Sequence, residues 1–180
     1  MTAFLKNKNL PNILTCARMA LIPVVMVLIA LGLDIPAGIV FVLASLTDFA
    51  DGYLARKNDI VSNFGKFLDP VADKLLVMTS MIMLSGRPGS LLPAWLVCVI
   101  LARDLLIDCL RMMAAKKGIV IAAGPLGKIK TTLQMLAVIA LLFLPETLNI
   151  ISLILIILMG LMTVISGADY LWRGRDVLKD

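Results

Sequence analysis

Six long apolar segments, separated by short polar or charged connections, dominate this chain. A helix needs about 20 residues to cross the hydrocarbon core of a bilayer, and each segment is close to that length. Of the 180 residues, 61% are hydrophobic and only 16% are charged, far from the composition of a soluble domain. The pattern predicts an all-α integral membrane protein. Its six transmembrane helices are expected at Asn12–Leu33, Pro36–Arg56, Lys66–Leu84, Leu92–Met113, Leu126–Leu144 and Asn149–Trp172.

Lysine and arginine in the connections and at helix ends lie almost entirely on one side of these predicted helices. The opposite side contributes only Arg87. Because Lys and Arg are enriched on the cytoplasmic side of membrane proteins, both termini are expected to be cytoplasmic. The same bias accounts for the net charge of +5 without nucleic-acid binding. The basic residues on the expected cytoplasmic side are Lys6, Lys8, Arg56, Lys57, Lys66, Lys116, Lys117, Lys128, Lys130, Arg173, Arg175 and Lys179.

No repeat or long linker divides the chain, so residues 1–180 are expected to form a single membrane domain. The first segment could instead be a secretory signal, because Lys6 and Lys8 precede an apolar run that reaches small residues at Ala30 and Gly32. Arg18 interrupts that run, and five further apolar segments follow it. A retained first helix is therefore the favoured interpretation.

The chain contains no histidine, which excludes histidine-based acid–base chemistry and histidine metal ligands. Carboxylates must then carry any proton transfer or metal binding. Cys16, Cys98 and Cys109 lie inside apolar segments without metal-ligand spacing, and we expect them to be buried as small hydrophobic residues.

Four aspartates interrupt two adjacent apolar segments. Asp48 and Asp51 have i, i+3 spacing and Asp69 and Asp73 have i, i+4 spacing, so each pair shares one helix face. The short connection Lys57–Gly65 makes the two helices antiparallel neighbours, which would bring the four carboxylates together near the cytoplasmic interface. An unpaired carboxylate in a membrane helix costs about 3 kcal/mol. Mg²⁺ or Mn²⁺ would satisfy such a cluster, and two metal ions close together suit phosphoryl chemistry.

Small residues and one cation accompany these aspartates. Gly52, Ala55 and Gly65 permit close approach either of a neighbouring helix or of the phosphates of a ligand, and the spacing alone does not decide between the two. Arg56 is the adjacent cation.

Together these residues resemble the complete signature of the CDP-alcohol phosphotransferases, with no departure from it. The motif is Asp48-x-x-Asp51-Gly52-x-x-Ala55-Arg56, followed after eight residues by Gly65-x-x-x-Asp69-x-x-x-Asp73. The resemblance implies a six-helix membrane enzyme in which the four aspartates bind two divalent cations, Mg²⁺ or Mn²⁺. It also implies that the two glycines, the alanine and the arginine of the motif surround the CDP group, and that Asp73 is the catalytic base.

Four further cations, in or beside the fourth and fifth segments, suit an acceptor that carries phosphate: Arg103, Arg111, Lys128 and Lys130. Arg103 lies deep in its helix, so it should have a partner such as Asp104, Asp108 or a bound anion. For the two lysines, the alternatives are the topological charge bias and contact with lipid headgroups.

Several stretches resemble bacterial phosphatidylglycerophosphate synthases in particular. They are Pro11-Asn12-x-Leu14-Thr15-x-x-Arg18, Ala102-Arg103-Asp104, Leu110-Arg111 and Gly127-Lys128-x-Lys130-Thr131-Thr132-x-Gln134. Asp104 departs from the Glu found in many relatives. This resemblance implies transfer of a phosphatidyl group from CDP-diacylglycerol to sn-glycerol 3-phosphate. It further implies a homodimer in the bacterial cell membrane, with its active site facing the cytoplasm.

Other functions stay open at this point. Within the same reaction class the acceptor could be phosphatidylglycerol, serine or inositol phosphate, although a neutral or zwitterionic acceptor would leave the basic residues without a phosphate. A divalent-cation transporter is the alternative from another class, because intramembrane aspartates also mark ion pathways. A purely structural bundle, with the aspartates paired to Arg56, Lys66 and Lys74, is disfavoured because buried ion pairs contribute little net stability.

Overall fold

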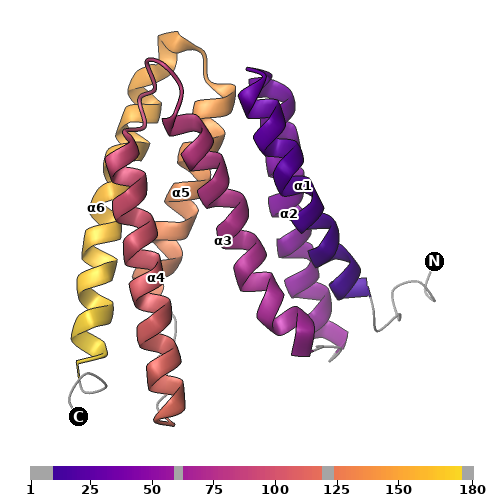
Figure 1. Ribbon diagram of the computed structural model, residues 1–180, viewed down its shortest axis with the longest axis vertical. Helices are drawn as coiled ribbons and strands as arrows, with labels where there is room; N and C mark the ends of the chain where they lie inside the picture. Colours follow the sequence, from indigo (N-terminus) through magenta and orange to yellow (C-terminus); the bar gives the residue numbers. More distant parts are fainter. Residues whose placement is uncertain (1–9, 59–62, 119–123, 176–180) are drawn as a thin grey trace. The chain divides into compact units, whose positions relative to one another are not determined.

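The computed structural model describes the backbone of residues 10–58, 63–118 and 124–175, and the side chains of residues 15–47, 71–118, 124–145 and 147–175. The described ranges contain six α-helices and no β-strand, and Figure 1 shows how the chain runs through them. The prediction of an all-helical chain with six helices is confirmed. The helices are α1 (Leu10–Ala30), α2 (Asp34–Asn58), α3 (Asn63–Ser85), α4 (Ala94–Lys116), α5 (Pro125–Phe143) and α6 (Asn149–Arg173), with a short 3₁₀ helix, η2 (Glu146–Leu148), before α6.

The end of α1 shows why the predicted boundaries differ from the observed ones by a few residues. The helix stops at Ala30 rather than at Leu33 because Gly32 adopts a φ of +72°, which a residue with a side chain rarely adopts. The amide of Leu33 then donates to the carbonyl of Leu28 at 3.0 Å, and the amide of Gly32 donates to that of Ile29 at 3.1 Å. These bonds satisfy carbonyl groups at the helix end, as in a Schellman motif.

The chain divides into two compact units, residues 1–83 and 84–180. In the first unit, α1 packs along α2. Buried residues recur at helical spacing on both helices, including Val25 and Ile29 on α1 and Ala37, Phe41 and Ala44 on α2.

In the second unit, α6 packs against both α5 and α4. The buried apolar residues of this unit include Ile100 and Ile107 of α4, Val138 of α5, and Ile156 and Met159 of α6. The helix α6 is therefore the element that joins the other two.

Large apolar side chains are also exposed on the helices, for example Val27, Leu106, Val164 and Trp172. Among the described residues, α5 and α6 are each long and apolar enough to cross a bilayer, while α1 and α2 contain the shorter apolar stretches Thr15–Ala30 and Asp34–Thr47. Such outward-facing apolar surface is typical of helices that contact lipid.

The prediction that the three cysteines are buried was wrong. Cys16, Cys98 and Cys109 are free thiols with exposed side chains. An apolar segment indicates a membrane helix without indicating which of its faces packs against protein, and all three cysteines lie on outward faces.

Candidate functional site

The helices α2 and α3 carry the whole eight-residue motif. Five of its residues lie within α2 and three within α3, namely Asp48, Asp51, Gly52, Ala55 and Arg56, then Gly65, Asp69 and Asp73. Of these residues, Asp73 alone has a side chain in the described part of the structure. The convergence of the four aspartates, and the CDP contacts of the other four residues, therefore stay predictions.

Asp73 is held by an arginine from another helix. The Nη1 of Arg18, on α1, donates to Oδ1 of Asp73 at 2.8 Å. The Arg18 side chain is completely buried, whereas that of Asp73 is 41% exposed. A buried guanidinium is costly without a carboxylate partner, so this ion pair accounts for the position of Arg18 inside α1. The exposed fraction leaves Asp73 accessible to a ligand while it is held.

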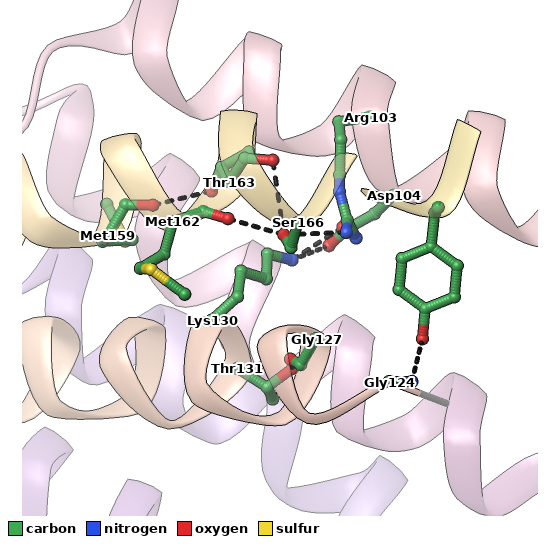
Figure 2. A network of polar contacts seen from close by, with 11 residues as sticks. Arg103, Asp104, Gly124, Gly127, Lys130, Thr131, Met159, Met162, Thr163 and Ser166 are labelled. Carbon is green, nitrogen blue, oxygen red and sulfur yellow. Dashed lines mark hydrogen bonds and ion pairs between the residues drawn. The ribbon is translucent and has the colours of Figure 1, made fainter. Parts of the chain in front are cut away.

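A second polar cluster lies within the unit of residues 84–180, and Figure 2 shows how its side chains converge from three helices. Lys130 of α5 donates from Nζ to both carboxylate oxygens of Asp104, at 2.6 and 2.5 Å. Arg103 of α4 donates from Nη1 to the same Oδ1 at 3.0 Å. One carboxylate thus holds two cations. The expectation that Arg103 has a partner is confirmed, and of the alternatives considered the described contacts show Asp104.

The helix α6 contributes a hydroxyl to this cluster. Arg103 donates from Nη2 to Oγ of Ser166 at 2.9 Å, and the Ser166 hydroxyl donates in turn to the carbonyl oxygen of Met162 at 2.5 Å (Figure 2). Because a hydroxyl has a single proton, this second bond directs its lone pairs toward Arg103.

Tyr170, one helical turn beyond Ser166, contacts both neighbouring helices. Its hydroxyl accepts a hydrogen bond from the backbone amide of Gly124, at the start of α5, with a separation of 3.0 Å. Its ring centroid lies 5.5 Å from Cζ of Arg103, within range of a cation–π interaction. Tyr170 is only 4% exposed, so both its ring and its hydroxyl are buried.

The described contacts leave this cluster with a positive surplus. Arg103 and Lys130 each contribute one positive charge and Asp104 contributes one negative charge. Lys130 and Asp104 are buried, and the Arg103 side chain is largely so. Arg103 Nε and Gln134 Nε2 are buried donors with no hydrogen-bond partner among the described residues. Surplus positive charge together with unsatisfied donors suits an anion with several acceptor oxygens, such as phosphate.

The structure brings together two of the four residues predicted to bind the acceptor phosphate, Arg103 and Lys130. Arg111 and Lys128 are exposed on α4 and α5, and the described contacts of the cluster do not include them. Sequence reasoning assigned no role to Ser166 and Tyr170. A serine inside an otherwise apolar helix was the available signal, since polar residues in such helices often bond across helix interfaces.

Residues 8–165 match the family model for CDP-alcohol phosphatidyltransferase. A Bacillus subtilis (strain 168) protein named CDP-diacylglycerol–glycerol-3-phosphate 3-phosphatidyltransferase is 40% identical over 190 aligned positions, which cover 95% of this chain and 97% of the relative. A Rickettsia bellii (strain RML369-C) protein with the same name is 40% identical, over 91% of this chain and 94% of its own length. A Mycobacterium tuberculosis (strain ATCC 25618 / H37Rv) protein named probable phosphatidylglycerophosphate synthase is 35% identical, over 94% and 83%.

Proposed function

This chain belongs to the CDP-alcohol phosphatidyltransferase family, and we propose that it transfers the phosphatidyl group of CDP-diacylglycerol to sn-glycerol 3-phosphate. The products are phosphatidylglycerophosphate and CMP. The observation that carries the choice of acceptor is the buried cluster in which Asp104 holds both Arg103 and Lys130. The names of the relatives support the same acceptor.

The acceptor phosphate offsets the positive surplus of this cluster. A phosphate monoester carries a charge of about −1.5 to −2 at neutral pH and offers three acceptor oxygens. Arg103 and Lys130 would donate to these oxygens. The other two residues predicted to bind the phosphate, Lys128 and Arg111, are exposed and would lie at the cytoplasmic ends of their helices. Serine or free inositol brings no phosphate and would leave the buried positive charge uncompensated.

Two divalent cations, Mg²⁺ or Mn²⁺, are proposed to bind Asp48, Asp51, Asp69 and Asp73. The donor set fits them, because all four side chains supply the oxygen ligands that these hard cations prefer, and Asp73 is accessible in the structure. When bound, the cations would neutralise the pyrophosphate of the donor. Gly52, Ala55, Arg56 and Gly65 are proposed to surround the CDP group.

Asp73 is proposed to accept the proton of the attacking hydroxyl of glycerol 3-phosphate. The hydroxyl oxygen forms a bond to the phosphorus that carries diacylglycerol, and the bond from that phosphorus to CMP breaks. Arg18 holds Oδ1 of Asp73 throughout, so the orientation of the carboxylate does not have to be established during the reaction.

The setting that we propose is a multi-pass protein of the bacterial cell membrane, active as a homodimer, with both termini and the active site on the cytoplasmic side. The exposed apolar side chains, the one-sided distribution of Lys and Arg, and the bacterial relatives support the membrane location. The family match covers parts of both compact units, which supports a single functional domain. A match to an enzyme family also argues against the cation-transporter alternative.

CMP release by the purified protein tests this function. CDP-diacylglycerol and Mg²⁺ or Mn²⁺ are supplied with one acceptor at a time: sn-glycerol 3-phosphate, serine, inositol phosphate or phosphatidylglycerol. Release with glycerol 3-phosphate alone is the expected result. Release with serine alone would contradict the assignment of the basic cluster, and metal uptake by vesicles without CMP release would contradict the reaction class.

A further inference from the structure

We infer that Tyr170 is a positioning residue of the acceptor site, which sets the affinity for the phosphorylated acceptor by holding Arg103 and the start of α5 in place. This inference rests on the proposed function of the Arg103–Lys130 cluster. Tyr170 contributes no charge and is not assigned a contact with the acceptor. Its effect passes through the residues that it touches.

The hydroxyl of Tyr170 fixes the beginning of α5. It accepts from the amide of Gly124, the residue that precedes the first turn of this helix, and Lys130 follows within two turns. A methyl group added at Gly127 would lie 3.2 Å from the Tyr170 hydroxyl and 3.3 Å from its ring, so a side chain at this position would require the tyrosine or α5 to shift by a few tenths of an ångström. The position of Lys130 along and around α5 therefore depends on this contact.

The ring of Tyr170 contacts Arg103 of α4. The guanidinium lies over the ring at 5.5 Å from its centroid, and the same group is bound by Asp104 and Ser166. A Cβ at Gly167 would lie 3.3 Å from Cγ of Arg103, so the arginine side chain runs close along the α6 backbone. With its stem, its Nη1, its Nη2 and its face all in contact, Arg103 is held before the acceptor arrives.

Preorganisation of this kind acts on binding. A phosphate that meets two cations already in place does not have to order them, so its affinity is higher than with mobile side chains. The partners of Tyr170 described above, Arg103, Gly124 and Gly127, all lie within the unit of residues 84–180. Its loss should therefore weaken binding of the acceptor and leave binding of the CDP-linked donor unchanged.

The test compares two variants of Tyr170 with a control on the same helix. Tyr170→Phe keeps the ring and removes the hydroxyl, and Tyr170→Leu removes both contacts. Trp172→Leu removes an exposed aromatic side chain two residues away and serves as the matched control. The KM values for sn-glycerol 3-phosphate and for CDP-diacylglycerol are measured separately, together with kcat.

We expect Tyr170→Phe to raise the KM for glycerol 3-phosphate about fivefold and Tyr170→Leu to raise it about thirtyfold. The KM for CDP-diacylglycerol should stay unchanged in both variants, and Trp172→Leu should match the wild type. A general loss of packing would instead lower kcat or change both KM values together, and either result would overturn the inference.

Gly127→Ala reaches the same contact from α5 and covers the case in which a tyrosine variant does not fold. It should also raise the KM for glycerol 3-phosphate selectively, and an unchanged value would overturn the inference. The wild-type acceptor screen separates the two proposals. If the wild type uses only a different acceptor, the proposed function fails, and the role of Tyr170 then fails separately if Tyr170→Phe leaves the KM for that acceptor unchanged.

Discussion

The two compact units of this chain place buried charge in different ways. In the first, buried Arg18 is matched by Asp73, whose carboxylate stays 41% exposed. In the second, two cations share the carboxylate of Asp104, which leaves a positive surplus among the contacts described there. An accessible carboxylate suits a cation, whereas a surplus cation suits an anion. This difference supports our proposal that the first unit binds the metal ions and the donor and that the second unit binds the acceptor.

The largest expected effect comes from removing a predicted metal ligand in the first unit. Asp69→Asn should lower kcat for CMP release about a thousandfold, because a neutral amide neither neutralises a divalent cation nor helps to stabilise the charge of the reacting phosphates. The binding of Mn²⁺, measured by electron paramagnetic resonance, should weaken in parallel. Asp34→Asn, on α2 but outside the motif, is the control and should keep both activity and Mn²⁺ binding. Normal Mn²⁺ binding by the Asp69 variant would contradict the metal assignment.

The next effect tests whether Arg18 serves Asp73. Arg18→Gln should lower kcat about a hundredfold, because the carboxylate loses its fixed partner, with the KM for glycerol 3-phosphate unchanged. Replacing the buried guanidinium can also lower the free energy of unfolding, so thermal unfolding in detergent should be measured with the activity.

Arg18→Lys is the conservative comparison for this prediction. It keeps the charge, so it should recover part of kcat. Arg175→Gln, which changes an exposed arginine, should resemble the wild type. An Arg18→Gln enzyme with normal kcat and a raised KM for glycerol 3-phosphate would instead place Arg18 in acceptor binding.

The third effect tests the positive surplus of the second unit. Lys130→Met leaves Arg103 and Asp104 as a neutral pair, so the attraction for a phosphate dianion is lost while most of the packing remains. The KM for glycerol 3-phosphate should rise about thirtyfold, as expected for loss of a charge-assisted hydrogen bond. The KM for CDP-diacylglycerol should not change. Lys116→Met, at an exposed position on α4, is the control, and equal effects of the two substitutions would mean that overall charge rather than the cluster governs binding.

The same comparison shows what could be predicted from the sequence. The predicted metal motif could be recognised because its residues lie within two helices that follow each other in the chain, and helical spacing alone places each pair of aspartates on one face of its helix. The six helices were visible for a similar reason, since each is a continuous apolar run. In both cases the decisive information is local in the chain.

The polar cluster around Asp104 could be predicted only in part because its contacts are not local. Arg103 meets Ser166 across 63 residues and Gly124 meets Tyr170 across 46. The charge of Arg103 and Lys130 was a usable signal, because a buried cation needs a partner. Ser166 and Tyr170 carry no charge, and only the packing of α6 against α4 and α5 brings them into contact with Arg103 and with the start of α5. The burial of the three cysteines was mispredicted for the related reason that an apolar run does not indicate an inner face.

The smallest effect compares two glycines on α6 that the sequence does not distinguish. A Cβ at Gly167 would lie 3.3 Å from Cγ of Arg103, a side chain held by Asp104 and Ser166, whereas a Cβ at Gly160 would lie 3.4 Å from a methyl group of Leu96, which can move. Either Gly→Ala change favours the helix by about 1 kcal/mol, so this contribution cancels in the comparison. Gly167→Ala should raise the KM for glycerol 3-phosphate about threefold because Arg103 must shift by a few tenths of an ångström. Gly160→Ala should leave it unchanged. Equal KM values would mean that the acceptor site tolerates such a shift, and that α6 supports the second unit without tuning its affinity.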